Sequence, residues 1–180
     1  MRYVGLSSSI FLAAALLMAE IKWGPSYYKT FSRLIAKKRS SIIYYFVVFS
    51  MFLITFSIFI VGWFVPHHKL PPLFTVIYIL GVIAQGICIA VPEVGGNKTT
   101  IHLFAAGIMS TSVILQTIFI LLLIPLKLSA LIVGALSTCI MLSSWLGYIF
   151  NFGFIKQELA VQSLYFAGYL ITIIVVSFTS

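Results

Sequence analysis

Charged residues are scarce in this chain, and acidic residues are much scarcer than basic ones. Only 8% of the 180 residues are charged, and Glu20, Glu93 and Glu158 are all of the acids. A soluble domain carries about 25% charged residues, so this chain has too little polar surface to cover a water-soluble globule. Since 62% of the residues are hydrophobic and the mean hydropathy is +1.17, the composition predicts an integral membrane protein.

The chain also lacks the motifs of metal, haem and hydrolytic chemistry. Cys88 and Cys139 stand alone in different apolar runs, which excludes a disulfide-exchange or iron–sulfur motif. The adjacent residues His67 and His68 are predicted on one side of the membrane and His102 on the other, so no two histidines can face each other as haem ligands. No P-loop, HExxH motif or Ser/His/Asp set is present. We therefore predict no metal and no cofactor, and we interpret His67 and His68 as exposed loop residues.

Ionisable residues are missing from the middle of every apolar run, where they would mark a proton relay or an ion path. This absence argues against a pump or a proton-coupled transporter. Neutral side chains such as Gln85 and Gln116 remain. Gln85 and Ser110 lie about 9 Å and about 12 Å below the same membrane surface at 1.5 Å per residue. We therefore predict a hydrogen bond between Gln85 and Ser110 that tightens the hairpin of the third and fourth spans.

Six long apolar runs make up most of the chain, and each has about the 20 residues that a helix needs to cross a bilayer. They cover residues 4–21, 42–65, 73–91, 101–124, 128–150 and 159–178. The runs are apolar around the whole helix circumference, whereas barrel strands would alternate. The sequence thus predicts an all-α fold, a single domain over residues 1–180 formed by a bundle of six transmembrane helices. In the fifth run, Ala130, Gly134 and Thr138 recur at every fourth position, which lets helix backbones approach closely in lipid.

The first loop, residues 22–39, is the longest and the most basic. Aromatic residues recur there at three- to four-residue spacing with basic residues between them, which predicts a short amphipathic helix on the membrane surface. This helix could act only as a topology anchor, or it could recognise anionic lipids. In the second case the candidate lipid contacts are Arg33, Lys37, Lys38 and Arg39.

Because six spans alternate in direction, the first, third and fifth loops share one side of the membrane, named here the odd-loop side. Eight of the eleven basic residues lie on it, whereas Arg2, Lys69 and Lys127 lie on the opposite side. The positive-inside rule then predicts that the odd-loop side is cytoplasmic and that both termini are outside, in the cell membrane. The positive charge is thus a topology signal, and we predict no nucleic-acid partner.

All three acids also fall on the odd-loop side. The candidate polar site consists of His102, Glu93, Glu158 and Asn97. A histidine beside a carboxylate at a membrane surface can act as an acid or base, or can bind a lipid headgroup. Two plainer interpretations stay open: the glutamates pair with neighbouring lysines, and His102 caps and packs the fourth span.

The order of three short motifs resembles that of a known family. Residues 91–93 (VPE) follow the third span, residues 102–106 (HLFAA) open the fourth, and residues 153–158 (GFIKQE) precede the last. This resembles a small six-span family of unknown function from bacteria and archaea, related to the DRAM and GPI-lipid-remodelling membrane proteins. The resemblance implies a six-helix bundle with a site on the odd-loop side that contains His102, Glu93 and Glu158. The chain departs from that family in its basic first loop and in the N-terminus that the charge count places outside.

Three functions fit these patterns. In the first, the protein binds or modifies a lipid headgroup at the odd-loop side. In the second, it is an uncoupled channel or carrier for small solutes, lined by neutral residues such as Gln85 and Gln116. In the third, it is a structural subunit of a larger membrane complex. Membrane lipids are the expected partners, and both a homo-oligomer and a second membrane protein stay open.

Overall fold

The computed structural model describes residues 1–23, 39–91, 96–150 and 158–179. Regular structure in these ranges is helical, and six of the helices are long and apolar enough to cross a membrane. The prediction of an all-α bundle of six transmembrane helices is therefore confirmed. The amphipathic helix predicted in the first loop falls mainly on residues 24–38, outside the described ranges.

The helices follow the predicted spans closely. The six long helices are α1 (Arg2–Trp23), α3 (Arg39–Phe59), α5 (Pro72–Ala90), α6 (Gly96–Leu123), α7 (Leu128–Ile149) and α8 (Glu158–Thr179). Helix α3 continues through the π-helix η1 (Ile60–Phe64) into the short helix α4 (Val65–His67). The largest difference is at α6, which begins at Gly96 rather than at residue 101. Its first turn contains Asn97, Lys98 and Thr99, and hydropathy cannot recognise such polar residues as part of a span.

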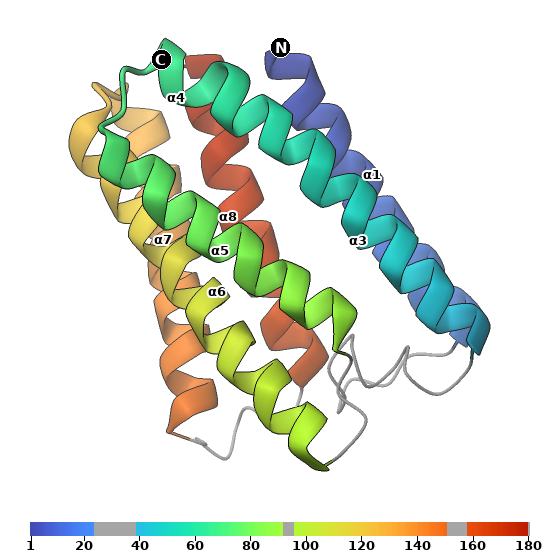
Figure 1. The fold of residues 1–180 in the computed structure, drawn as a ribbon. Helices are drawn as coiled ribbons and strands as arrows, with labels where there is room; N and C mark the ends of the chain where they lie inside the picture. The colour runs from blue at the N-terminus through green and yellow to red at the C-terminus, as the bar shows by residue number, and fades with distance from the viewer. Residues whose placement is uncertain (24–38, 92–95, 151–157, 180) are drawn as a thin grey trace.

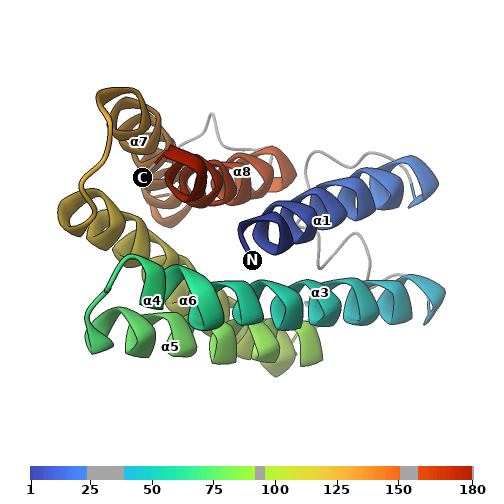
Figure 2. The same cartoon turned by 90° about the horizontal axis from the view of Figure 1, so that it is seen from above.

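Consecutive helices pair as hairpins, and α8 closes the bundle. The pairs are α1 with α3, α5 with α6 and α7 with α8, while α8 also contacts α1 and α6. Seen from above, α1 and α3 lie side by side, as do α7 and α8 (Figure 2). The helix ends that flank residues 24–38, 92–95 and 151–157 all lie at one end, and α4 and both chain termini lie at the other (Figure 1). The first of these is the predicted odd-loop end, and the second is named the even-loop end.

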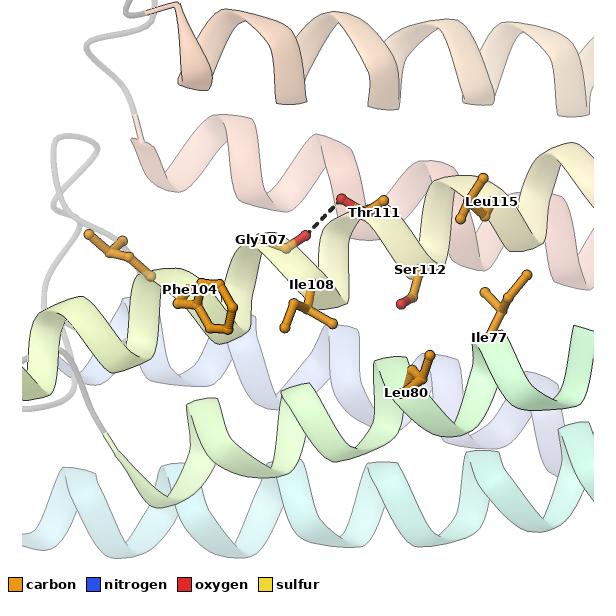
Figure 3. A pocket seen from close by; sticks show the side chains of 9 residues that line it. Ile77, Leu80, Phe104, Gly107, Ile108, Thr111, Ser112 and Leu115 are labelled. Atoms are coloured by element: carbon orange, nitrogen blue, oxygen red, sulfur yellow. Dashed lines mark hydrogen bonds between the residues drawn. The ribbon is translucent and has the colours of Figure 1, made fainter.

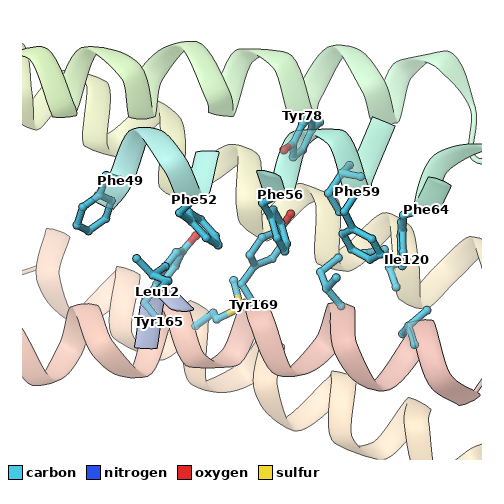
Figure 4. Packing of buried hydrophobic residues seen from close by; sticks show 14 of the residues in the cluster. Leu12, Phe49, Phe52, Phe56, Phe59, Phe64, Tyr78, Ile120, Tyr165 and Tyr169 are labelled. Atoms are coloured by element: carbon cyan, nitrogen blue, oxygen red, sulfur yellow. The ribbon is translucent and has the colours of Figure 1, made fainter. Parts of the chain in front are cut away.

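An aromatic row on α3 forms much of the core (Figure 4). Phe49, Phe52, Phe56 and Phe59 recur at alternating spacings of three and four residues, so they share one helix face. All four are at most 5% exposed. Phe52 and Phe56 stack with their ring centroids 5.0 Å apart, and Phe56 meets Tyr169 of α8 edge-on at 6.0 Å. The row thus holds α3 against α8 by ring contacts.

The π-helix at the end of α3 has a local cause in Pro66. Proline has no backbone N–H, and in an α-helix its ring would clash with the carbonyl of Gly62, four residues earlier. The helix widens instead, and the Val65 N–H bonds to the Ile60 carbonyl, five residues earlier, in the π pattern. The span therefore continues to His67, so the second loop is shorter than the sequence suggested.

The prediction that His67 and His68 are exposed loop residues is only half right. His67 is exposed, but it belongs to α4. His68 is half-buried, and its ring packs against Phe64 with the centroids 4.6 Å apart. The continuation of the helix past Pro66 draws His68 back onto the preceding turn.

The small-residue row on α7 packs against its neighbours as predicted. Ala130 is 1% exposed and Thr138 is 6% exposed. A Cβ atom at Gly134 would lie 2.6 Å from the Leu121 side chain of α6 and 3.6 Å from the Thr172 side chain of α8. The absence of a side chain at Gly134 therefore allows both helices to approach α7.

The predicted hydrogen bond between Gln85 and Ser110 is wrong. The Gln85 Nε2 atom is buried with no hydrogen-bond partner in the described ranges, and the Ser110 carbonyl accepts from the Tyr165 hydroxyl of α8. The Gln116 Oε1 atom likewise accepts from the Tyr169 hydroxyl at 2.6 Å. Matching depth on two helices does not establish that the side chains face each other, and the tyrosines of α8 occupy the interior at these levels.

Gly168→Ala is expected to lower the melting temperature of the detergent-purified protein. The new Cβ would lie 2.9 Å from Met141 Cγ and 3.1 Å from the Ser137 carbonyl oxygen of α7, and overpacking of this kind costs about 1–3 kcal/mol. Gly86→Ala is the control, because a Cβ there meets no atom within 4 Å, and the substitution should stabilise the helix by about 0.5–1 kcal/mol. Equal melting temperatures for the two variants would contradict the close packing of α7 and α8.

Candidate functional site

His102 links the end of α5 to the first turns of α6. Its side chain is 6% exposed, and its Nδ1 atom lies 2.7 Å from the carbonyl oxygen of Val91, the residue that follows α5. A carbonyl oxygen can only accept, so Nδ1 donates this bond. Carbonyls at the C-terminus of a helix have no partner within the helix, and His102 supplies one. This contact agrees with the plainer interpretation, in which His102 caps and packs.

The second nitrogen of His102 is not used by this contact. Because Nδ1 carries the donated hydrogen, Nε2 of the neutral ring has a lone pair, and no described residue bonds to it. The backbone of His102 is held as well, since its carbonyl lies 3.7 Å from Cys88 Sγ of α5. The ring is thus held in place on one edge, and its Nε2 can accept a hydrogen bond or a proton from a ligand.

The other members of the candidate polar site are only partly described. Asn97 is exposed in the first turn of α6, at the same end of the bundle as His102. Glu158 is the first residue of α8 and so belongs to this end too, but its side chain is outside the described part of the chain. Glu93 falls within residues 92–95, which are also outside. The structure therefore brings Asn97 and His102 to one helix start and leaves both glutamates as predictions.

The four basic residues predicted to contact anionic lipids cannot be compared with the structure. Arg33, Lys37 and Lys38 fall within residues 24–38, outside the described ranges. Arg39 is the first residue of α3, at the odd-loop end, and its side chain is not among those described. The proposed lipid contacts of this loop remain a prediction.

An apolar groove runs along the outer surface between α5 and α6 (Figure 3). Its volume is about 560 Å³, within the range of about 300–1,000 Å³ that is typical of ligand pockets. The side chains that line it include Leu80 of α5 and Phe104, Ile108 and Leu115 of α6. Phe104 is 73% exposed, so the groove opens to the surroundings of the bundle, which in a membrane are lipid.

The floor of the groove is open because α6 has Gly107 there. A Cβ at this position would meet no atom within 4 Å. One turn further on, the Thr111 hydroxyl donates to the Gly107 carbonyl at 2.9 Å (Figure 3). Since that bond satisfies the hydroxyl within the helix, the groove keeps an apolar surface.

Asn97 and the groove lie on one face of α6. Positions at three- or four-residue spacing share one face of a helix. On α6 such a series consists of residues 97, 100, 104, 107, 111 and 115. The part from Phe104 to Leu115 is about 17 Å long at 1.5 Å per residue. This face, named here the α6 stripe, therefore passes from a polar start at Asn97 into the apolar groove.

The groove was not predicted from the sequence. Every residue that lines it is also a normal residue of a transmembrane helix, and lipid-facing and buried positions are equally apolar. The available signal was the spacing of Gly107 and Thr111 relative to Asn97, which marks one face with small or polar residues.

Comparison of the chain with protein-family models, with curated proteins and with solved structures finds no match. The resemblance to the six-span family related to lipid-remodelling proteins therefore stays a prediction.

His102→Ala is expected to destabilise the α5–α6 hairpin by about 1–3 kcal/mol, because the Val91 carbonyl loses its partner at a buried position. Thermal unfolding in detergent measures the loss. Ile101→Ala is the control, since Ile101 is 50% exposed and precedes His102 directly. His102→Asn should recover part of the stability, because an amide nitrogen can replace Nδ1 as the donor. If His102→Ala and Ile101→Ala unfold at the same temperature, the hydrogen bond from His102 to the Val91 carbonyl contributes nothing to the stability of the protein.

Proposed function

We propose that the protein binds a membrane lipid at its odd-loop end, with an acyl chain in the α5–α6 groove and the headgroup at the start of α6. The observation that carries this proposal is the α6 stripe, which joins a polar helix start to an apolar groove of about 560 Å³. A lipid has the same order of chemistry, with a polar group at the surface and a hydrocarbon chain beneath it. The surrounding bilayer supplies such molecules directly.

The start of α6 favours a headgroup that carries a phosphate. Its first backbone N–H groups lack partners within the helix and carry the positive end of the helix dipole. Asn97 adds an exposed amide, and Lys98 adds an exposed positive charge. His102 would hold this turn in place through Val91. An acid–base step on the headgroup would need His102 with Glu93 or Glu158, so modification of the lipid depends on these residues.

The alternative of a channel has less support from the geometry. Gln116, one of the residues predicted to line a pore, is 1% exposed, and its Oε1 atom accepts from Tyr169 at 2.6 Å. A solute passing this level would have to displace that bond between α6 and α8. The third alternative, a subunit of a larger complex, is compatible with lipid binding and is tested by looking for a co-purifying protein.

The charge distribution supports a cytoplasmic odd-loop side, with both chain termini outside, in the cell membrane. Eight of the eleven basic residues lie at that end in the sequence, and the positive-inside rule concerns short loops of this kind. The proposed lipid would then be taken from the inner leaflet, where anionic lipids attract basic segments.

Gly107→Leu is expected to fill the groove and to remove a specifically bound lipid. Native mass spectrometry of the protein from a gentle detergent should show about tenfold less retained lipid, the ratio that corresponds to ~1.4 kcal/mol. Gly86→Leu is the matched control, because it adds the same side chain at another transmembrane glycine whose Cβ meets no atom within 4 Å. Gly86 does not line the groove, so this variant should retain the lipid.

The same measurement on His102→Ala and Asn97→Ala tests the headgroup end of the site. Asn97→Ala should weaken lipid retention without lowering the melting temperature, because Asn97 is exposed. Identical lipids at identical occupancy in the wild type and in Gly107→Leu would refute the proposed site.

A further inference from the structure

The even-loop end of the bundle has three basic residues, and none of the three glutamates of the sequence belongs to it. Arg2, Lys69 and Lys127 lie there, whereas all three glutamates occur at or between helix ends of the odd-loop end. An anion at the even-loop end would therefore meet no nearby carboxylate from the glutamates of this chain.

Arg2 is held at this end by two aromatic rings from different helices. Its guanidinium carbon lies 5.8 Å from the centroid of Trp63 in η1 and 5.9 Å from that of Phe178 in the last turn of α8. Cation–π attraction of this kind is effective within about 6 Å. No described residue forms an ion pair with Arg2 or accepts a hydrogen bond from it. The guanidinium is thus positioned, and its N–H groups have no acceptor among the residues that the structure describes.

His67 contacts the same Trp63 ring that Arg2 contacts. It is exposed, and it stacks on Trp63 with the centroids 4.6 Å apart and an angle of 18° between the rings. The stacking depends on the π-helix, since Trp63 lies within η1 and His67 in the α4 turn that follows. Single π turns in helices are frequent at functional sites.

The neighbouring His68 does not contribute charge near neutral pH. Burial, together with a smaller effect of the adjacent His67, lowers the pKa of His68 to about 4. Its Nε2 atom is buried without a hydrogen-bond partner in the described ranges. His68 therefore adds no positive charge to that of Arg2 at this end.

We propose that Arg2, Trp63 and His67 form a second lipid site, at the even-loop end, that binds the phosphate of an anionic phospholipid. A guanidinium donates two parallel hydrogen bonds to a phosphate, and the exposed imidazole of His67 can donate another. Tryptophan is enriched at the depth of the headgroups, which places Trp63 where the phosphates are. A zwitterionic headgroup fits less well, because its ammonium group would find basic residues and none of the glutamates of this chain. This site is independent of the α5–α6 groove, since the two share no residue and lie in opposite leaflets.

Lipid titration followed by native mass spectrometry tests this proposal on the whole purified protein. The wild type is titrated with phosphatidylglycerol and with phosphatidylcholine of the same chain length. We expect tighter binding of phosphatidylglycerol, and a loss of about tenfold in Arg2→Gln, since a hydrogen bond to a charged group is worth that order of affinity. Binding of phosphatidylcholine should stay unchanged.

Three variants serve as controls. Lys127→Gln removes an exposed positive charge from the same end and should leave the preference intact. Arg2→Lys keeps the positive charge and should recover part of the binding. Melting temperatures show whether each variant is folded, so a loss of binding through the lost charge can be told from a loss through unfolding. Gly107→Leu should keep the preference for phosphatidylglycerol, so failure of the groove proposal and failure of this one are distinguishable.

Three results would overturn the proposal. One is equal affinity for the two lipids in the wild type, and another is an equal loss in Lys127→Gln and Arg2→Gln. The third is competition by inorganic phosphate at the same concentration as phosphatidylglycerol, which would identify a site for the free anion instead of a lipid.

Discussion

Association of helices within lipid gains little from the hydrophobic effect, because lipid chains are as apolar as the helix surfaces. The bundle therefore depends on close packing and on hydrogen bonds between helices. Tyr44 of α3 donates to the Ala15 carbonyl of α1 at 2.8 Å, and the hydroxyls of Ser57 in α3 and Tyr78 in α5 lie 2.9 Å apart. In contrast, α7 is held by close backbone approach at its small residues, and none of its described side chains hydrogen-bonds to another helix.

The dependence on close packing and on hydrogen bonds between helices makes the interior of the bundle different from its candidate sites. Inside, Gln116 and Tyr169 satisfy each other, whereas Gln85 Nε2 is buried with no partner among the described residues. Outside, the α6 stripe and the Arg2–Trp63 cluster have groups with no partner in the described ranges or surfaces with no cover. The candidate sites are therefore surfaces that face lipid and headgroups, at both ends of the protein.

Much of the fold was predictable, because a 20-residue apolar run has few alternatives to a transmembrane helix. Apart from the small-residue row of α7, which face of each helix points inward was not predictable. Phe56 is 3% exposed and Phe104 is 73% exposed, yet both are phenylalanines within apolar runs, and a lipid environment does not distinguish them. Gln85 failed to reach Ser110 for this reason, and the groove was missed for the same reason. At the candidate site, the sequence identified the end of the bundle and His102, but not its bond to Val91, which depends on how the chain turns after α5.

The unequal lengths of α5 and α6 have a further consequence. Helix α6 has 28 residues and α5 has 19, which correspond to about 42 Å and about 28 Å at 1.5 Å per residue. A hydrocarbon core of about 30 Å matches α5, so α6 must tilt strongly or extend into the headgroup layer. The apolar part of α6, residues 101–123, is about 35 Å long at 1.5 Å per residue, and hydrophobic mismatch of this smaller size is relieved by tilting or by local thickening of the bilayer. The depth of Asn97 is therefore linked to bilayer thickness, and a thicker host membrane would draw the start of α6 closer to the hydrocarbon.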